Sequence, residues 1–235
     1  MAFIIDFVLI AILGLSFWRG WKNGLVRGIF GILGLLVAII GANILANTFS
    51  PEFSGMLRPF VGGLVDSTLT DVLRPAGSDA VDGDVPLDVE GGGEVYNAAY
   101  NALRKIGLFD SAAKSLAEKI AGDTEGGGNS ISRALTDKLT STLSYVAVFA
   151  IAFILLSIII AVIGNLVNFV FELPGLKLLN AIAGGTFGLG KGLLVVLFIA
   201  LVVRYVGILK PDAVEQTAVL DFFVNHNVIA NTLGI

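Results

Sequence analysis

Apolar residues fall into four long runs, and the spacing of these runs predicts the architecture of the chain. The runs cover residues 2–18, 24–46, 143–171 and 181–205. A helix needs about 20 residues to cross the ~30 Å hydrocarbon layer of a membrane, so the last three runs are long enough and the first is marginal. We therefore predict an all-α membrane protein with four transmembrane helices, plus short amphipathic helices in a long outer loop and at the C-terminal end.

The first run has a second interpretation, a cleaved signal peptide. Such a peptide needs a basic segment before its apolar core and small residues at its cleavage site. Residues 1–6 carry no positive charge, and residues 18–21 read Trp-Arg-Gly-Trp, which is a poor cleavage site. We therefore favour a retained membrane anchor.

The polar stretch between the second and third runs sets the domain boundaries. We predict transmembrane helices 1 and 2 in residues 1–46, an extracytoplasmic loop in 47–142, helices 3 and 4 in 143–207, and a C-terminal amphipathic segment in 208–235. Residues 77–93 are too rich in Gly and Asp to order themselves by burying apolar surface.

Two short amphipathic patterns follow this linker, and a third follows the last run. Apolar residues share one helical face at each of them, and Asp110 or Ser111 is a plausible N-cap for the second pattern. The first two helices could lie in the membrane interface or pack on each other as a small cap, and we expect the third to lie on the outer interface. The faces are Tyr96, Tyr100 and Leu103; Ala113, Leu116, Ala117 and Ile120; and Val219, Phe222, Phe223 and Ile229.

The charge of the short turn between runs one and two predicts the orientation. Arg19 and Lys22 lie in this turn and Arg27 follows it, with no acidic residue among them. Residues 47–142 hold 8 Lys and Arg against 14 Asp and Glu. Basic residues in short loops stay in the cytoplasm, whereas long loops cross largely regardless of charge. We therefore expect both termini and the 47–142 loop outside.

Composition excludes several classes of function. The 235 residues are 55% hydrophobic and 14% charged, with a mean hydropathy of +0.87, which a water-soluble enzyme of this size could not bury. A net charge of −4 argues against nucleic-acid binding. The absence of Cys and the presence of His226 alone leave no thiolate or histidine cluster for a metal. We expect no cofactor and no metal, and as partners the lipid bilayer and either a second copy or another membrane protein.

A run of carboxylates in the outer loop does not change this expectation. Its spacing does not fit the EF-hand pattern, so we interpret it as a solvated acidic linker. The acidic residues are Asp79, Asp82, Asp84, Asp88 and Glu90.

Polar residues inside the runs are the candidate functional residues. Asp6 lies roughly 18 Å from the cytoplasmic end of run one and Lys191 roughly 15 Å into run four, at 1.5 Å per residue, so the two could meet near the midplane. Alternatively, Asp6 is an outer-interface residue. Arg27 is near the inner face, where it can snorkel. Asn165 and Asn168 could hydrogen-bond between helices or line a polar path.

Glycines recur every fourth residue in runs two and four. This spacing puts them on one helix face, where a neighbouring backbone can approach closely, in the same chain or another subunit. Residues 185–192 approach a phosphate loop, but Gly192 replaces its Ser or Thr and the segment lies inside a span, so we reject nucleotide binding. The packing glycines are Gly20, Gly24 and Gly28, and Gly184, Gly188 and Gly192.

Three blocks of sequence resemble the colicin V production protein family. They are Asp6 followed by the 19–27 segment Arg-Gly-Trp-Lys-Asn-Gly-Leu-Val-Arg; Gly-Asn-Leu-Val-Asn-Phe at 164–169; and residues 174–192, from Pro-Gly-Leu-Lys-Leu-Leu-Asn to Gly-Lys-Gly. The resemblance implies a small multi-pass protein of the bacterial cytoplasmic membrane, with a role in toxin (bacteriocin) production or export and in the envelope. The long outer loop departs from the family pattern.

Two functions fit these observations. One is a non-enzymatic accessory or scaffold subunit of a membrane assembly, which suits the glycine faces and the large outer loop. The alternative is a homo-oligomeric channel or small-solute exporter that uses Asp6, Asn168 and Lys191 in its spans. A membrane-embedded protease would need paired acids or Ser and His within the spans, and only Asp6 is present.

Overall fold

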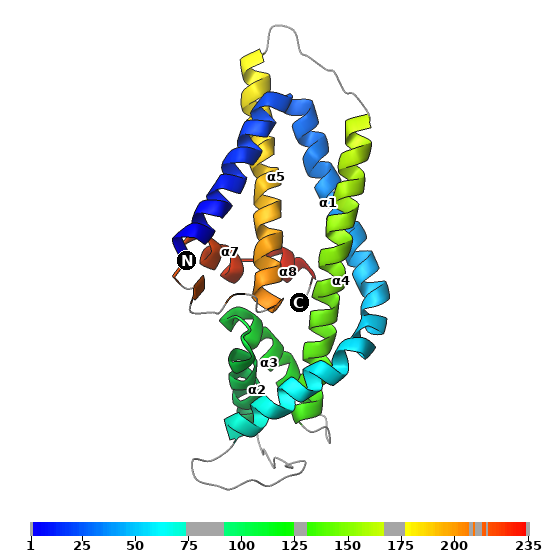
Figure 1. The fold of residues 1–235 in the computed structure, drawn as a ribbon, viewed down its shortest axis with the longest axis vertical. Helices are drawn as coiled ribbons and strands as arrows, with labels where there is room; N and C mark the ends of the chain where they lie inside the picture. The colour runs from blue at the N-terminus through cyan, green and yellow to red at the C-terminus, as the bar shows by residue number, and fades with distance from the viewer. Residues whose placement is uncertain are drawn as a thin grey trace.

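The computed structural model describes residues 2–73, 92–124, 131–166 and 177–206, and, closer to the C-terminal end, 209, 213–214 and 216–233. The regular elements of these residues are all α-helices (Figure 1). The helices are α1 (Ala2–Leu73), α2 (Gly92–Ile106), α3 (Asp110–Thr124), α4 (Ile131–Leu166), α5 (Lys177–Val206), α7 (Val219–Asn225) and α8 (Val228–Leu233).

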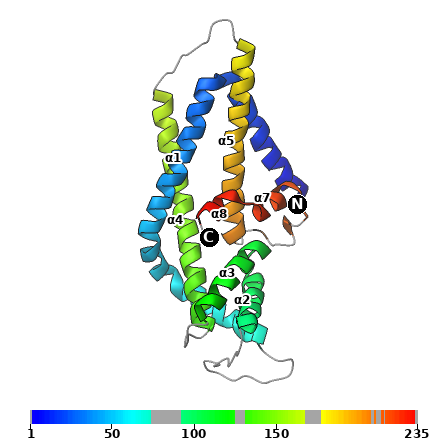
Figure 2. The same ribbon diagram turned by 180° about the vertical axis from the view of Figure 1, so that it is seen from behind.

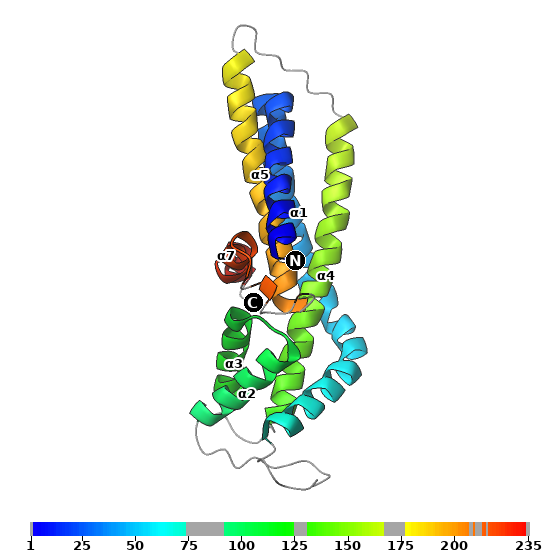
Figure 3. The ribbon, with the colours of Figure 1, turned by 60° about the vertical axis from the view of Figure 1, so that its left-hand side comes forward.

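Helix α1 reverses direction at Gly24. This residue has φ 77° and ψ 175°, outside the helical region, and a positive φ is a conformation that glycine adopts without steric cost. The chain runs to one end of the molecule, turns there and comes back (Figures 1 and 3). We call residues 2–23 the first arm and residues 25–73 the second arm. The predicted turn at 19–23 is therefore wrong, because the helix continues to Asn23 and the reversal takes place at a single glycine.

The second arm also continues past residue 46, the end of the predicted second span and the start of the predicted outer loop. It passes through Pro51 and Pro59, although proline removes a backbone donor and bends a helix. In the turn before Pro51, polar side chains bond to carbonyls of the same helix: the Asn47 amide donates to Asn43 O at 3.0 Å and the Thr48 hydroxyl to Ile44 O at 2.9 Å. The helix bends here rather than ending, as the cyan part of Figure 1 shows.

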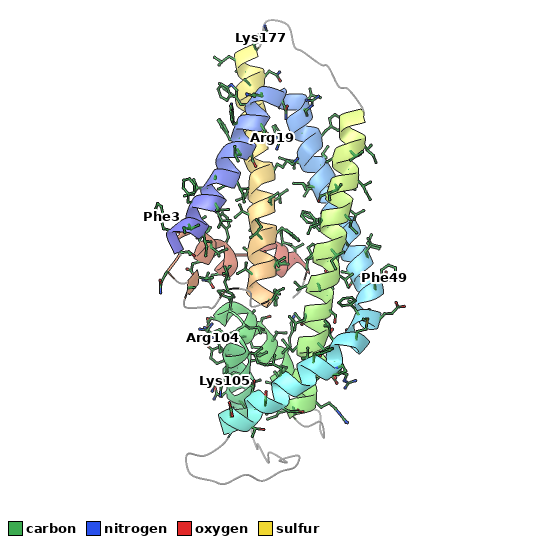
Figure 4. The ribbon with its side chains drawn as sticks, viewed as in Figure 1. Phe3, Arg19, Phe49, Arg104, Lys105 and Lys177 are labelled. Carbon is green, nitrogen blue, oxygen red and sulfur yellow. The ribbon has the colours of Figure 1, made fainter. Side chains whose placement is uncertain are left out.

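The long helices form an elongated bundle around α1. Helix α5 lies along the first arm, and α4 lies along the second arm (Figures 1 and 3). Helices α4 and α5 meet at Phe153 and Phe198, whose ring centroids lie 4.3 Å apart with the ring planes tilted by 35°. Three described helices are long and apolar enough to cross a membrane: Phe3–Asp71, Ile131–Gly164 and Lys177–Val206. Apolar side chains such as Phe3 and Phe49 point outward from the bundle (Figure 4).

Helices α2 and α3 pack on each other and form what we call the helical cap, together with the start of α4 and the end of the second arm (Figure 2). Its core consists of aliphatic side chains that are at most 2% exposed, and it realises the cap that we had weighed against interfacial helices. Ion pairs at its surface join Lys105 to Asp71 at 3.0 Å and Lys138 to Asp123 at 3.2 Å. The core residues are Leu103, Leu116, Ile120, Leu135 and Leu139.

The C-terminal amphipathic segment is two short helices, α7 and α8, instead of the single helix that we predicted. Asn227 separates them because its side chain is fully buried and bonded on both sides. Its amide donates to Leu197 O at 2.8 Å, and its Oδ1 accepts from the Ala230 N–H at 3.1 Å, which caps α8 and ties it to α5. Phe222 and Val228 remain exposed.

Candidate functional site

The glycines of the first arm and of α5 meet inside one chain. A Cβ atom added to Gly20 would lie 2.7 Å from Gly188 Cα, and one added to Gly184 would lie 2.7 Å from Gly24 Cα. A Cβ on Gly192 would lie 2.8 Å from Ser16 Cβ. Real Cβ contacts are longer than this, so the two backbones touch and leave no space for side chains. The partner of these faces, which spacing alone left open, is the same chain.

Asn180 anchors the reversal of α1. Its Oδ1 accepts a hydrogen bond of 2.8 Å from the Leu25 N–H, which is the first free backbone donor of the second arm. A Cβ on Gly24 would lie 2.6 Å from Asn180 Nδ2, so the Asn180 side chain of α5 packs directly against the backbone of the turn. From the sequence, Asn180 was identified only as part of a block that resembles the family. A polar residue at the start of an otherwise apolar run was the signal that could have identified it.

Asp6 caps helix α7. Its carboxylate accepts hydrogen bonds from the N–H groups of Ala218 at 2.8 Å, Val219 at 3.1 Å and Leu220 at 3.3 Å. A carboxylate at a helix N-terminus is favoured because it satisfies free donors and faces the positive end of the helix dipole. The acidic residue early in the first arm therefore joins the two ends of the described chain.

The structure does not bring Asp6 and Lys191 together. Gly192 packs against Ser16, so Lys191 is level with a residue about 15 Å along the first arm from Asp6, at 1.5 Å per residue. The possible meeting that we weighed does not occur, because the depth of Asp6 was counted from Trp18, whereas the arm extends to Asn23. Asp6 lies at the opposite end of the first arm from the turn, as the alternative interpretation had it.

Lys191 is exposed on α5, and its Cδ lies 3.7 Å from the position of a Cβ on Gly31 in the second arm. Among the residues that the structure describes, no hydrogen bond or ion pair to its ammonium group is found. An ammonium group in this position, inside an apolar helix, is a functional candidate because charge at this depth is costly.

The basic residues of the turn gather at one end of the bundle. Figure 4 shows Arg19 and Lys177 there. Lys22 places its ammonium 4.1 Å from the ring centroid of Trp18, and exposed Arg27 bonds to Asn23 at 3.4 Å. The sequence has no acidic residue in 7–51, 138–166 or 177–206, so the described residues of this end carry positive charge alone.

A polar contact between α1 and α4 inside the apolar spans was not predicted from the sequence. The Tyr145 hydroxyl donates to Asn43 Oδ1 at 2.7 Å, and the same oxygen accepts from the Asn47 amide at 2.8 Å. Such contacts hold apolar helices together where hydrophobic burial contributes little. An isolated Asn in an apolar run was the signal available.

The remaining candidates lie partly outside the described residues. The side chain of Asn165, all of Asn168, and the acidic linker at 79–90 belong to them. Within the described part of the chain, no group of three or more His, Asp or Glu is arranged to hold a metal ion.

Comparison with known proteins gives one match. The family model described as Colicin V production protein matches residues 5–79 and 111–228, which take in most of α1, α3 to α5 and α7. No curated protein and no solved structure matches the chain. The match and the apolar helices together indicate a membrane protein.

Proposed function

The chain belongs to the colicin V production protein family, and from this premise we propose that it is a non-enzymatic scaffold subunit of the bacterial inner membrane that serves bacteriocin production or export. The observation that carries the proposal is the continuous helix of the second arm. It joins the apolar bundle to the helical cap without a break, so the cap is held at a fixed place relative to the membrane.

A four-span topology follows from treating the arms of α1 as two crossings. The first arm is roughly 33 Å long at 1.5 Å per residue, enough for the ~30 Å hydrocarbon layer. The basic residues at the turn favour a cytoplasmic position for that end. The termini and the cap then lie outside, where the charged surface of α2 and α3 is hydrated.

Single cysteines test this topology cleanly, because the natural chain has none. Asn97 of α2 and Lys22 near the turn are both exposed. With a membrane-impermeant maleimide on intact spheroplasts, we expect Asn97→Cys to label and Lys22→Cys to label only after permeabilisation. The reverse pattern would overturn the orientation.

The scaffold role is tested by bacteriocin secretion in a strain that lacks its own copy of the protein. Leu116→Asp places a charge in the cap core without touching the glycine contact, and we expect it to abolish secretion while the bundle still inserts. Lys191→Met is the matched change within a span and should leave secretion near the natural level. Loss of secretion with Lys191→Met but not with Leu116→Asp would contradict a scaffold.

A homo-oligomeric channel is the second candidate, and exposed Lys191 favours it. In a ring of subunits the ammonium group would face a shared polar path instead of lipid. Purified protein in planar bilayers tests this. A conducting oligomer whose ion selectivity reverses in Lys191→Glu would support the channel, and a non-conducting monomer would exclude it.

A further inference from the structure

Arg204 is the one charged side chain among the buried residues that the structure describes, at 5% exposure near the end of α5. Its Nε has no hydrogen-bond partner, and no ion pair to its guanidinium is found among the described residues. The guanidinium carbon lies 5.4 Å from the ring centroid of Tyr205, which supplies an aromatic face but no acceptor for the N–H groups. A buried cation in this state needs an anion.

Two further buried polar atoms lack partners at the same level of the bundle. They are the Tyr205 hydroxyl, in a residue that is 1% exposed, and the Ser144 hydroxyl, in a fully buried residue of α4. Phe198 contacts both Phe149 and Phe153, and this antiparallel register puts Tyr205 level with Ser144. Polar groups without partners therefore gather where α4 and α5 approach the helical cap.

This level corresponds to lipid headgroups in the four-span topology proposed above, on which the inference rests. Asn180 is level with the turn at Gly24, and Arg204 lies roughly 36 Å further along α5 at 1.5 Å per residue. The hydrocarbon layer is only ~30 Å thick, so the guanidinium lies at the outer headgroup layer. The exposed Phe222 of α7 and Val228 of α8 belong to the same end of the bundle.

We propose that Arg204 and Tyr205 bind a phosphate group at the outer end of α5. The planar guanidinium offers paired N–H donors that match two phosphate oxygens, and the phenol hydroxyl offers another donor. The α4 and α5 spans supply no carboxylate, because residues 138–166 and 177–206 contain no Asp or Glu. The phosphate comes from a phospholipid headgroup or from free phosphate, and the experiment separates these sources.

The experiment measures thermal unfolding of the full chain, delipidated in a non-ionic detergent, by the fluorescence of its two tryptophans. The added probes are dioleoyl-phosphatidylglycerol, dioleoylglycerol as the same lipid without phosphate, and sodium phosphate against sodium chloride at equal ionic strength. The variants are Arg204→Gln and Arg204→Lys, with Arg27→Gln as a matched loss of an arginine at the opposite end of the bundle.

We expect phosphatidylglycerol to raise the melting temperature of the natural protein and of Arg27→Gln, and dioleoylglycerol to have no such effect. Arg204→Gln should melt no lower than the natural protein without lipid, because it removes a buried charge that lacks a partner, and should lose the response to lipid. Arg204→Lys keeps the positive charge but lacks the paired N–H donors of the guanidinium, so its apparent affinity for phosphatidylglycerol should fall about ten- to hundred-fold. An equal response to sodium phosphate would identify free phosphate, and a response to lipid alone would identify the headgroup.

Three outcomes would overturn the site: equal stabilisation by dioleoylglycerol, an unchanged lipid response in Arg204→Gln, or a lipid-free melting temperature that is lower in Arg204→Gln than in the natural protein. The last result would mean that the chain itself supplies the anion. If Arg204→Gln does not fold, Arg204→Lys and native mass spectrometry of lipid bound to the natural protein decide the question. Bacteriocin secretion does not enter these measurements, so the scaffold proposal stands or fails separately.

Discussion

The glycine contact between the first arm and α5 differs from the helical cap in how its helices are held together. In the contact, the buried positions are glycines such as Gly20, Gly184 and Gly188, and backbone touches backbone. In the cap, the buried positions are aliphatic side chains such as Leu116 and Leu139. Several large apolar residues of the first arm and of α5 are exposed, among them Phe7, Trp18 and Leu189.

The difference follows from the solvent of each region. Lipid tails are as apolar as leucine, so burying a leucine between two membrane helices gains little, and close contact of backbones replaces it. Water surrounds the cap in the proposed topology, so burial of side chains there is strongly favoured. One chain therefore uses two packing chemistries, and substitutions in each region should respond differently.

The largest expected effect tests the glycine contact. In Gly188→Leu, the new side chain meets the backbone of Gly20, where its Cβ alone would lie 2.9 Å from Cα. Overpacking a close-packed contact costs on the order of 1–3 kcal/mol and more where backbone has to move, so the free energy of unfolding should fall by more than about 3 kcal/mol and folded protein should be lost. Fluorescence-detected size exclusion in detergent measures this yield.

Gly14→Leu is the matched control. Gly14 lies in the first arm, like Gly20, but no atom lies within 4 Å of a Cβ at its position. It should leave the yield unchanged. Equal loss from both variants would mean that leucine, and not contact, is responsible.

The second prediction tests the cap. Leu116→Ala leaves a cavity in a side-chain core, and the free energy of unfolding of the cap should fall by about 3 kcal/mol. Hydrogen exchange should then speed up across α2 and α3 while the bundle stays protected. Leu64→Ala, at a position 45% exposed, should change stability by less than about 0.5 kcal/mol. Equal deprotection of the α5 amides would contradict the separation of the two regions.

The third prediction sharpens the boundary at Gly24. Asn180→Leu keeps the size of the side chain but removes the acceptor of the Leu25 N–H, so stability in detergent should fall by about 1 kcal/mol. Asn180→Asp keeps an acceptor and should fall by less. Thermal melting of the two variants side by side measures the difference, and a ranking in the opposite order would remove the role of this hydrogen bond.

The smallest effect concerns acid. Hydrogen bonds from the Lys114 ammonium and the Tyr100 hydroxyl hold the pKa of Asp110 below its usual 3.8. A carboxylate with a lowered pKa adds stability that is present above pH 3.8 and is lost as the pH falls through the folded value. Because Asp110 is 42% exposed, the loss should stay well under about 1 kcal/mol.

Asp110→Asn should flatten this acid dependence of the cap, followed as hydrogen exchange of α3. A natural protein whose cap is equally stable at pH 6 and pH 2.5 would show that the pair contributes nothing.

Spacing along the chain predicted which glycines form packing faces, but not which helix each face packs against. The four-residue repeat of glycine identified both faces, whereas their mutual contact depends on the reversal at Gly24. The extension of the second arm beyond residue 46 was not predicted, because proline usually ends or kinks a helix, whereas this helix passes through both Pro51 and Pro59.

Asp6 shows the same limit at longer range. An acidic residue in an apolar run identified it as a candidate. Its partners are the backbone N–H groups of Ala218 and Val219, and every residue type except proline carries such a group, so the sequence could not identify them. Depth counted along a run is also wrong when the end of the run is misplaced, and for this reason a meeting of Asp6 with Lys191 was one of the two alternatives.

The carboxylate of Asp6 has a consequence for the order in which the protein is made. Its acceptor bonds to residues 218–220 span 212 to 214 positions of sequence. At the usual 5–20 residues per second, the ribosome finishes that partner roughly 10 to 40 s after Asp6 has been translated. The first arm therefore has to wait for α7 before the carboxylate of Asp6 finds its hydrogen-bond donors, and a nascent chain interrupted before residue 218 does not contain them.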